Sequence, residues 1–387
     1  MGVKGPFWVQ LKSCARSVSA ESIEGKRLAI DMSAWLVEAE SSKGLGVAHA
    51  HPHLFLVFSR VVKLLKLKCR PIGVFEGKAH PQKKRKGRKL LDEKGEAARQ
   101  LLEALGVPCV HAPEEAEATA AALTAKGLAD GVISEDSDAL LYGATAVYRG
   151  LGGSRESVVI DASQHEVFGL GGSIQHSLVA CALLVGTDII HNSPPGIGVD
   201  KAFTFLKHCA FRGQSALDVI VEWRDDRPDV KKLKNTFLTG ASSETAKIST
   251  AIWRHCKQGT FPDDKIVATF LDHDAKIPPE AKKLEWRQPS AKALYFVNAL
   301  HCVYGHTLET SGKKIEDILA SSRVLVNDDD ENSEAGGSPL PPPSGPAQPL
   351  VRVYRGEAHE EPFYIVPPSL LAAEATTPTS SAFLCAS

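Results

Sequence analysis

The first 190 residues of the chain alternate between short apolar runs and segments with helical spacing. Four short runs have the composition of buried β-strands, at residues 27–31, 71–77, 107–110 and 131–134. Apolar residues recur every three or four positions in the segments between them, at 53–67, 97–105 and 114–126. Gly106 and Gly127 follow the last two segments, as is typical of helix ends. This alternation predicts an α/β fold, with a twisted, mostly parallel sheet flanked by helices.

After Ser177 the pattern becomes mainly helical. Helical runs cover residues 178–185, 200–209, 242–256 and 290–302. From Asn327 the chain is acidic and then rich in Pro, Gly and Ser, a composition that buries too little apolar surface to order itself. We therefore expect an α/β domain, a helical C-terminal region and a flexible linker with a tail, over residues 1–176, 177–320 and 321–387. A short apolar run at 363–366 has no assigned function.

Composition narrows the class of protein. Hydrophobic residues make up 43% and charged residues 24% of the 387 positions, as in soluble globular proteins. The net charge of −1 does not decide about nucleic acid, because clustered acids can be offset by basic residues elsewhere. The eight cysteines form no C-x-x-C pair, which argues against zinc and favours reduced thiols. Without a signal pattern or an apolar run of about 18 residues, we expect a soluble intracellular protein.

Carboxylates follow the predicted strands and helix starts. The seven candidates for metal binding and catalysis are Asp31, Glu76, Glu115, Glu117, Asp136, Asp138 and Asp188. Taken singly, each has a structural explanation, as a turn former, a helix cap or a partner of the helix dipole. In a parallel sheet, however, the carboxyl ends of the strands share one edge, where ligands bind. Like charges crowded at that edge repel one another unless cations neutralise them.

Carboxylate oxygens suit Mg²⁺ or Mn²⁺ better than zinc. Two such ions, roughly 3.5–4 Å apart, activate water and stabilise the leaving oxygen of a phosphodiester. The residues alone therefore indicate metal-assisted phosphoryl chemistry. A small-molecule phosphatase is one alternative, but the basic run and the glycine turn described below would have no purpose in it.

At these same residues the chain resembles the flap endonuclease and XPG superfamily. Six motifs in the expected order carry the resemblance: MGVKGPFW (1–8), LAIDMSAW (28–35), VFEG (74–77), APEEAEA (112–118), SEDSDALL (134–141), and LLVGTD (183–188) followed by GIGVDKA (196–202). Within the superfamily, Glu76 in place of Asp, Phe7-Trp8, the Val-Glu-Ala-Glu after Trp35 and the segment around Trp286 resemble the GEN-like class. That class comprises Holliday-junction resolvases and plant single-strand endonucleases.

The resemblance implies a PIN-like 5′-nuclease core with a helix–two-turn–helix element. It implies a magnesium-dependent, structure-selective endonuclease of DNA repair and recombination that leaves a 5′-phosphate and needs no protein nucleophile. Asp136, Asp138 and Asp188 would mainly hold one Mg²⁺ or Mn²⁺ ion, and the remaining four acids would hold or orient the other, some of them through water. A replication-type flap endonuclease, a single-strand endonuclease and an inactive scaffold for branched DNA stay open as alternatives. The intact acid set argues against the scaffold.

The resemblance also implies DNA contacts. Residues 83–89 (KKRKGRK) form a basic run in a short arch over 77–100, which argues against threading of a free 5′ end. Phosphate contacts are expected from Lys83, Lys84, Arg85 and Arg88, although the run also fits a solvated loop or a nuclear-localisation signal.

Further DNA contacts are expected from the two ends of the segment that carries the six motifs. Gly196, Gly198 and Lys201 would face the DNA backbone beside a K⁺ ion, and Gly2 would lie near the bend of the duplex. The expected partner is branched double-stranded DNA, bound by a homodimer where it has four arms. We found no sliding-clamp motif and expect a nuclear protein.

Overall fold

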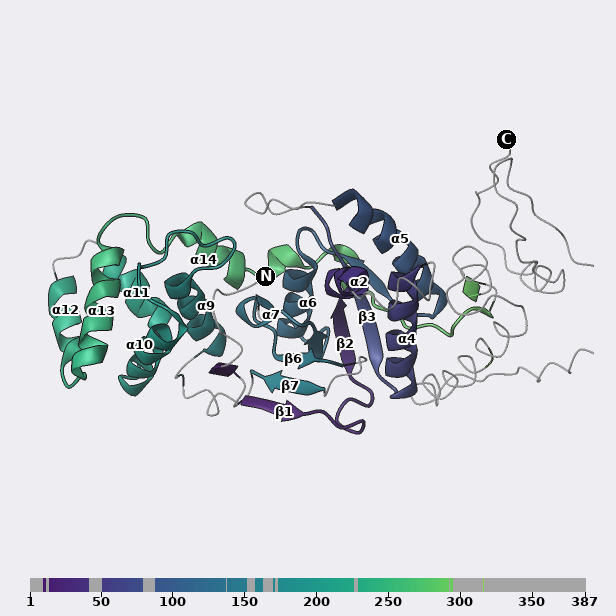
Figure 1. The fold of residues 1–387 in the computed structure, drawn as a ribbon, viewed down its shortest axis with the longest axis horizontal. Coiled ribbons are helices and arrows are strands. Elements are labelled where there is room, and N and C mark those ends of the chain that lie inside the picture. Colours follow the sequence, from purple (N-terminus) through teal and green to yellow (C-terminus); the bar gives the residue numbers. More distant parts are fainter. Residues whose placement is uncertain are drawn as a thin grey trace, which may run out of the picture.

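The computed structural model describes residues 10–11, 14–41, 51–78, 88–136, 138–151, 157–162, 170, 173–225, 229–291, 293–294 and 316. Within these residues one sheet has the strand order β1-β7-β6-β5-β2-β3-β4 (Figure 1). The strands are β1 (Ala15–Ser17), β2 (Arg27–Asp31), β3 (Arg70–Phe75), β4 (Cys109–His111), β5 (Gly131–Ile133), β6 (Ala146–Arg149) and β7 (Val158–Asp161). Neighbours from β6 to β4 are parallel, whereas β7 is antiparallel to β6 and β1. This confirms the mostly parallel α/β sheet.

Both faces of the sheet are buried, which explains why its central strands are continuous apolar runs. On β2, Leu28 and Ile30 face one apolar cluster, and Ala29 between them faces another. The first cluster is completed by α2 (Met32–Ser41), α4 (Pro52–Lys66) and α5 (Arg88–Ala104). The second is completed by α6 (Ala116–Ala125), α7 (Asp138–Leu141) and the helices that follow. The residues of each face alternate along the strand, as the two-residue period requires.

The helical region packs onto the second cluster rather than forming a separate core. It contains α9 (Ile174–Val185), α10 (Val199–Phe211), α11 (Ala216–Arg224), α12 (Val230–Leu238), α13 (Ser243–Cys256) and α14 (Asp264–Leu271). Ser173, Ser215 and Ser242 cap three of these helices by accepting backbone hydrogen bonds. In Figure 1 the region forms the left-hand end of the molecule, and its helix α9 packs against α7. The predicted boundary at residue 177 falls inside α9, and the domain limits stay predictions.

After α14 the chain returns to the α/β part through residues 272–291, which we call the return segment. It contains two short 3-10 helices, η2 (Asp274–Lys276) and η3 (Pro279–Lys282). Trp286 Nε1 donates a hydrogen bond of 2.8 Å to the carbonyl oxygen of Pro71 on β3. The amide of Arg287 donates to the carbonyl oxygen of Gly106 at 2.9 Å. These two hydrogen bonds therefore connect the return segment to β3 and to the turn after α5.

Gly106 allows the return segment to pass, and its replacement by alanine is expected to be unusually destabilising. Gly106 has φ +75°, and an added Cβ would lie 1.9 Å from the carbonyl oxygen of Arg287. Gly127 has a similar φ of +69° but open space around the same position. The left-handed backbone should cost about 1 kcal/mol in each alanine variant, and the clash roughly 1–3 kcal/mol more in Gly106→Ala. Urea unfolding of both variants measures the difference, and equal losses would contradict it.

None of the helices in the described part of the chain combines the length and the hydropathy that a membrane-spanning segment needs.

Candidate active site

The central strands deliver three of the predicted carboxylates to one edge of the sheet. Asp31 is the last residue of β2, Glu76 follows β3 directly, and Asp136 lies just after β5. Because β5, β2 and β3 are adjacent and parallel, their carboxyl ends open side by side. This is the edge at which α/β sheets bind ligands.

Two helix starts bring further acids to the same edge. Glu115 immediately precedes α6, and Glu117 lies in its first turn. Glu76 Oε2 accepts a hydrogen bond of 3.2 Å from the amide of Ala116, and Glu117 Oε1 accepts one of 2.8 Å from the amide of Ala139 in α7. The carboxylates thus satisfy amides that a helix start leaves unpaired. These bonds place the starts of α6 and α7 against the strand ends.

The acids are close enough to raise one another's pKa. One oxygen each of Glu117, Asp136 and Asp138 lie within 4.8 Å of one another. Burial raises the pKa of Asp31 to about 7, with further contributions from Glu76 and Asp136. Burial also raises the pKa of Glu117, as do the charges of four neighbouring acids, Asp136, Asp138, Asp31 and Glu115. The structure therefore gathers six of the seven predicted carboxylates.

This group fits a hard divalent cation. Its donors are all carboxylate oxygens, with no cysteine or histidine in the described cluster of Glu117, Asp136 and Asp138. Oxygens bound to one Mg²⁺ at about 2.1 Å are roughly 3–4 Å apart, so small side-chain movements would close these three around an ion. A cation there would also remove the repulsion that raises the pKa of Asp31 and Glu117.

Polar residues that sequence reasoning missed hold the acids in place. Ser33 Oγ donates to Glu76 Oε1 at 2.9 Å, and the Ser33 amide donates to Asp31 Oδ1 at 3.0 Å. Tyr142 on the turn after α7 donates from its hydroxyl to Glu115 Oε2 at 3.1 Å. Ser33 lies inside the motif LAIDMSAW, whereas a single tyrosine after an apolar run gives no signal in the sequence.

Asp188 is the one predicted acid that belongs to the helical region. It lies in the loop after α9, where Thr187 Oγ1 accepts hydrogen bonds from the amides of Ile189 and Ile190. That loop follows a helix that packs against α7, the helix that starts at Asp138. Its side chain is partly buried. Its role as a metal ligand stays a prediction.

The predicted DNA-contact residues fall into two groups. Gly196 has φ +73° and open space where a Cβ would stand, Gly198 precedes α10, and Lys201 Nζ donates to the carbonyl oxygen of Gly196 at 2.8 Å. These three residues form one exposed turn at the positive end of the α10 dipole, an arrangement suited to a phosphate. Gly2, Lys83, Lys84 and Arg85 lie outside the described residues. Arg88 begins α5, but its side chain is also outside them.

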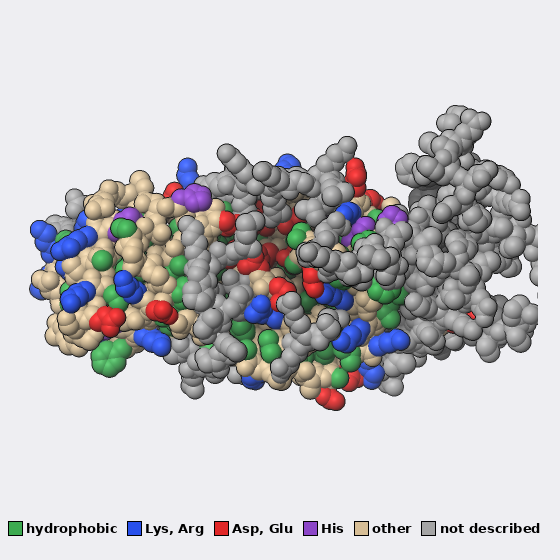
Figure 2. Space-filling view, in the orientation of Figure 1, with side chains coloured by type: hydrophobic (Ala, Val, Ile, Leu, Met, Phe, Trp, Pro, Cys, Tyr) green, Lys and Arg blue, Asp and Glu red, His purple; other side chains and the backbone are tan. Residues whose placement is uncertain are grey.

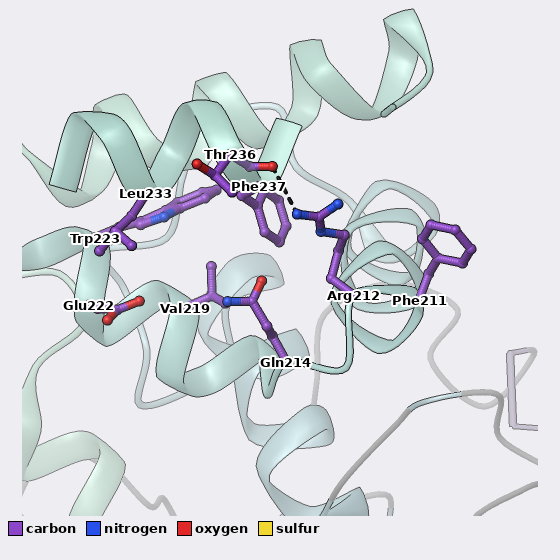
Figure 3. Close-up of a pocket in the computed structure, with 9 residues that line it drawn as sticks. All are labelled: Phe211, Arg212, Gln214, Val219, Glu222, Trp223, Leu233, Thr236 and Phe237. Atoms are coloured by element: carbon purple, nitrogen blue, oxygen red, sulfur yellow. Dashed lines mark hydrogen bonds between the residues drawn. The ribbon is translucent and has the colours of Figure 1, made fainter. Parts of the chain in front are cut away.

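The helical region contains a pocket that is distinct from the acid site. Figure 2 shows Asp and Glu side chains gathered in the middle of the face, and Lys and Arg at the end formed by α12 and α13. The pocket, of about 390 Å³, lies between α10, α11 and α12, with Arg212 donating to the carbonyl oxygen of Thr236 across it (Figure 3). Phe211 at its rim is 83% exposed. None of the seven candidate acids lines this pocket.

Family comparison agrees with the site. The XPG N-terminal domain matches residues 1–97 and the XPG I-region matches residues 106–188. The first range contains Asp31 and Glu76, and the second contains the other five predicted acids. The matched regions therefore cover the entire candidate metal site.

The chain is similar to several named nucleases. Flap endonuclease GEN-like 1 of Arabidopsis thaliana is 34% identical over 236 residues, which cover 54% of this chain and 39% of the relative. Flap endonuclease GEN homolog 1 of Homo sapiens is 29% identical over 246 residues, covering 58% of this chain and 27% of the relative. The chain thus spans well under half the length of these relatives.

Solved structures share the fold. Human GEN1 in complex with Holliday junction DNA matches with a TM-score of 0.65 and 23% identity, over 83% of this chain and 78% of that one. The catalytic core of Rad2 matches with a TM-score of 0.55 and 25% identity, over 83% of this chain and 99% of that one. The chain thus carries the XPG N-terminal domain and the XPG I-region around its acid cluster, and its sequence is similar to those of GEN-like flap endonucleases.

Proposed function

We propose that this protein is a metal-dependent, structure-selective DNA endonuclease of the GEN-like class. It would cut branched DNA, such as Holliday junctions and 5′ flaps, and leave a 5′-phosphate during repair and recombination. The observation that carries this proposal is the gathering of six carboxylates at one sheet edge in a chain that carries the XPG N-terminal domain and the XPG I-region. The names of the GEN relatives and the junction DNA in the human GEN1 structure support the choice of substrate.

Two Mg²⁺ ions, for which Mn²⁺ would substitute, are proposed to bind among the acids. Asp136 and Asp138 would hold one ion together with Asp188, while Asp31, Glu76 and Glu115 would hold or orient the other. Glu117 would belong to this second group, and its carboxylate also lies close to those of Asp136 and Asp138. When bound, the ions would supply activation of water and stabilisation of the leaving oxygen. Mg²⁺ is present in a solved GEN1 structure with product DNA.

The protein's own groups would fix the acids and the DNA. Hydrogen bonds from Ser33 and from the amide of Ala116 orient Glu76 before any ligand binds. The turn from Gly196 to Gly198 would lie against the backbone of one duplex arm. A K⁺ ion bound at this turn stays a proposal, supported by a solved GEN-1 structure that binds potassium. The ammonium of Lys201 already donates to one carbonyl of this turn.

The remaining DNA contacts are proposed on the sequence alone. The basic run at 83–89 would contact phosphates near the cut, and Gly2 would lie at the bend of the duplex. Symmetric cutting of a four-way junction requires two active sites, so we propose that two copies assemble on that substrate. A nuclear location follows from a role in repair and stays a proposal.

The proposal is tested by nicking labelled 5′-flap and four-way-junction DNA side by side, with Mg²⁺ and with EDTA. Paired symmetric cuts in the junction that disappear with EDTA are expected. Flap cutting with an untouched junction would instead indicate a flap endonuclease. Binding of both DNAs without any cutting would contradict the nuclease and favour the scaffold.

A further inference from the structure

We propose that Tyr142 is a positioning residue for Glu115 and thereby sets the affinity of the metal site. The inference rests on the proposed function, because Glu115 is a ligand or orienting group only if the acids bind metal. The Tyr142 hydroxyl donates to Glu115 Oε2 at 3.1 Å. Tyr142 is 2% exposed and Glu115 5% exposed, so water has little access to this bond.

A buried carboxylate needs such a partner if it is to act on a metal. A hydrogen bond to one oxygen limits rotation of the carboxylate and gives the other oxygen a fixed direction. Groups that orient metal ligands in this way contribute substantially to metal affinity in other proteins. A tyrosine hydroxyl is a protonated donor at neutral pH, because its ordinary pKa is about 10. Tyr142 therefore serves Glu115 as a permanent donor.

The ring of Tyr142 is itself fixed by the helical region. Its centroid lies 5.1 Å from that of Phe270 on α14, and Lys276 Nζ in η2 lies 5.5 Å from it. Thr119 on α6 donates from Oγ1 to the carbonyl oxygen of Lys276 at 2.8 Å. The ring thus packs between the first part of the return segment and the helix that presents Glu115. A phenylalanine would fill the same space, so the hydroxyl is separable from the packing.

Tyr148 provides a matched control. It is 3% exposed, and its hydroxyl lies 3.2 Å from Lys26 Nζ, which donates to it. Its ring lies against Gly131, at the amino end of β5. The acids lie at the opposite, carboxyl ends of the parallel strands. Tyr142→Phe and Tyr148→Phe each remove one hydroxyl that makes a hydrogen bond from a buried ring. Only the first removal touches the candidate site.

The test is calorimetric titration of the full chain with Mg²⁺ alone, in the absence of DNA. We expect Tyr142→Phe to weaken Mg²⁺ binding by about 10-fold, at the lower end of the 10–100-fold typical of such partners. Tyr148→Phe should bind Mg²⁺ like the unaltered protein. In the nicking assay, the Mg²⁺ concentration for half-maximal rate should rise by the same factor in Tyr142→Phe, with KM for DNA unchanged.

A second comparison tests whether the effect passes through Glu115. In a Glu115→Ala background, Tyr142→Phe should have no further effect on Mg²⁺ affinity, since its partner is gone. Unchanged Mg²⁺ affinity in Tyr142→Phe, an equal loss in Tyr148→Phe, or a full loss that persists in the Glu115→Ala background would each overturn the proposal. If Mg²⁺ binding weakens as expected but the unaltered protein cuts no DNA, the positioning role stands and the nuclease proposal fails.

Discussion

Asp136→Asn is expected to reduce DNA cutting by at least about 10³-fold while making the metal-free protein more stable. The loss of cutting follows because Asp136 is a proposed ligand, and removing several kcal/mol of metal-dependent stabilisation slows the reaction by this factor. The gain in stability follows because the charge of Asp136 raises the pKa of both Asp31 and Glu117, and so opposes folding when all three are ionised. Its removal should stabilise by on the order of 1 kcal/mol.

The two opposed effects are measured by nicking with Mg²⁺ and by thermal unfolding in EDTA at pH 8. Glu135→Gln is the matched control, because this neighbouring acid instead accepts from the amide of Gly150 at 2.6 Å and pairs with Arg149 at 3.2 Å. The control should retain cutting and should not gain stability. A melting temperature of Asp136→Asn at or below that of the unaltered protein would show that the acids do not repel one another as described.

Mg²⁺ is expected to raise the melting temperature strongly at pH 8 and little at pH 5. The pKa of Asp31 is about 7 in the folded chain, above its ordinary value of 3.8. An acid with a raised folded pKa contributes stability that is complete below its unfolded pKa and is lost as pH rises through the folded one. The metal-free protein should therefore lose on the order of a few kcal/mol from this group between pH 4 and pH 8.

Mg²⁺ binds the ionised acids. At pH 8 it should therefore restore the folding stability that repulsion among these acids removes. At pH 5, protons already neutralise Asp31 and compete with the ion. Differential scanning fluorimetry with EDTA or Mg²⁺ at both pH values measures this, with Ca²⁺ and K⁺ as further additions. Equal Mg²⁺ shifts at both pH values would argue that the ion binds elsewhere.

The central strands of the sheet were predictable because buried parallel strands have continuous apolar sequences. β2 has the predicted limits, and β3, β4 and β5 differ from prediction by a few residues at their ends. The strands β1, β6 and β7 were missed, since three or four residues carry too little pattern to be distinguished from a turn. α5 begins at Arg88, whereas the sequence predicted a start at residue 97. The first turns of this helix are mostly charged, so they show no apolar period.

Much of the helical region also escaped prediction. In α12 (VKKLKNTFL), only Val230 and Phe237 are buried, so the apolar period of this helix is weak. Its place is decided by contacts that the local pattern does not contain. Trp223 and Phe237, for example, pack edge to face with centroids 5.2 Å apart.

The acids of the site were predictable from their order and from the strand ends that carry them, but the groups that hold them were not. The bonds from Ser33 to Glu76 and from Tyr142 to Glu115 join residues 43 and 27 positions apart. Such pairs are formed by the packing of α7 and α2 against neighbouring strands and helices, so no local motif announces them. The seventh acid, Asp188, stays a prediction from sequence.

The crossing of the return segment over Gly106 has a consequence for how this architecture varies among homologues. The carbonyl oxygen of Arg287 occupies the space of the missing Cβ, so two positions 181 residues apart constrain each other. A homologue with a side chain in place of Gly106 must lead its C-terminal segment along another path. If helical regions are exchanged between relatives, by recombination or by design, Gly106 and the return segment therefore have to be transferred together.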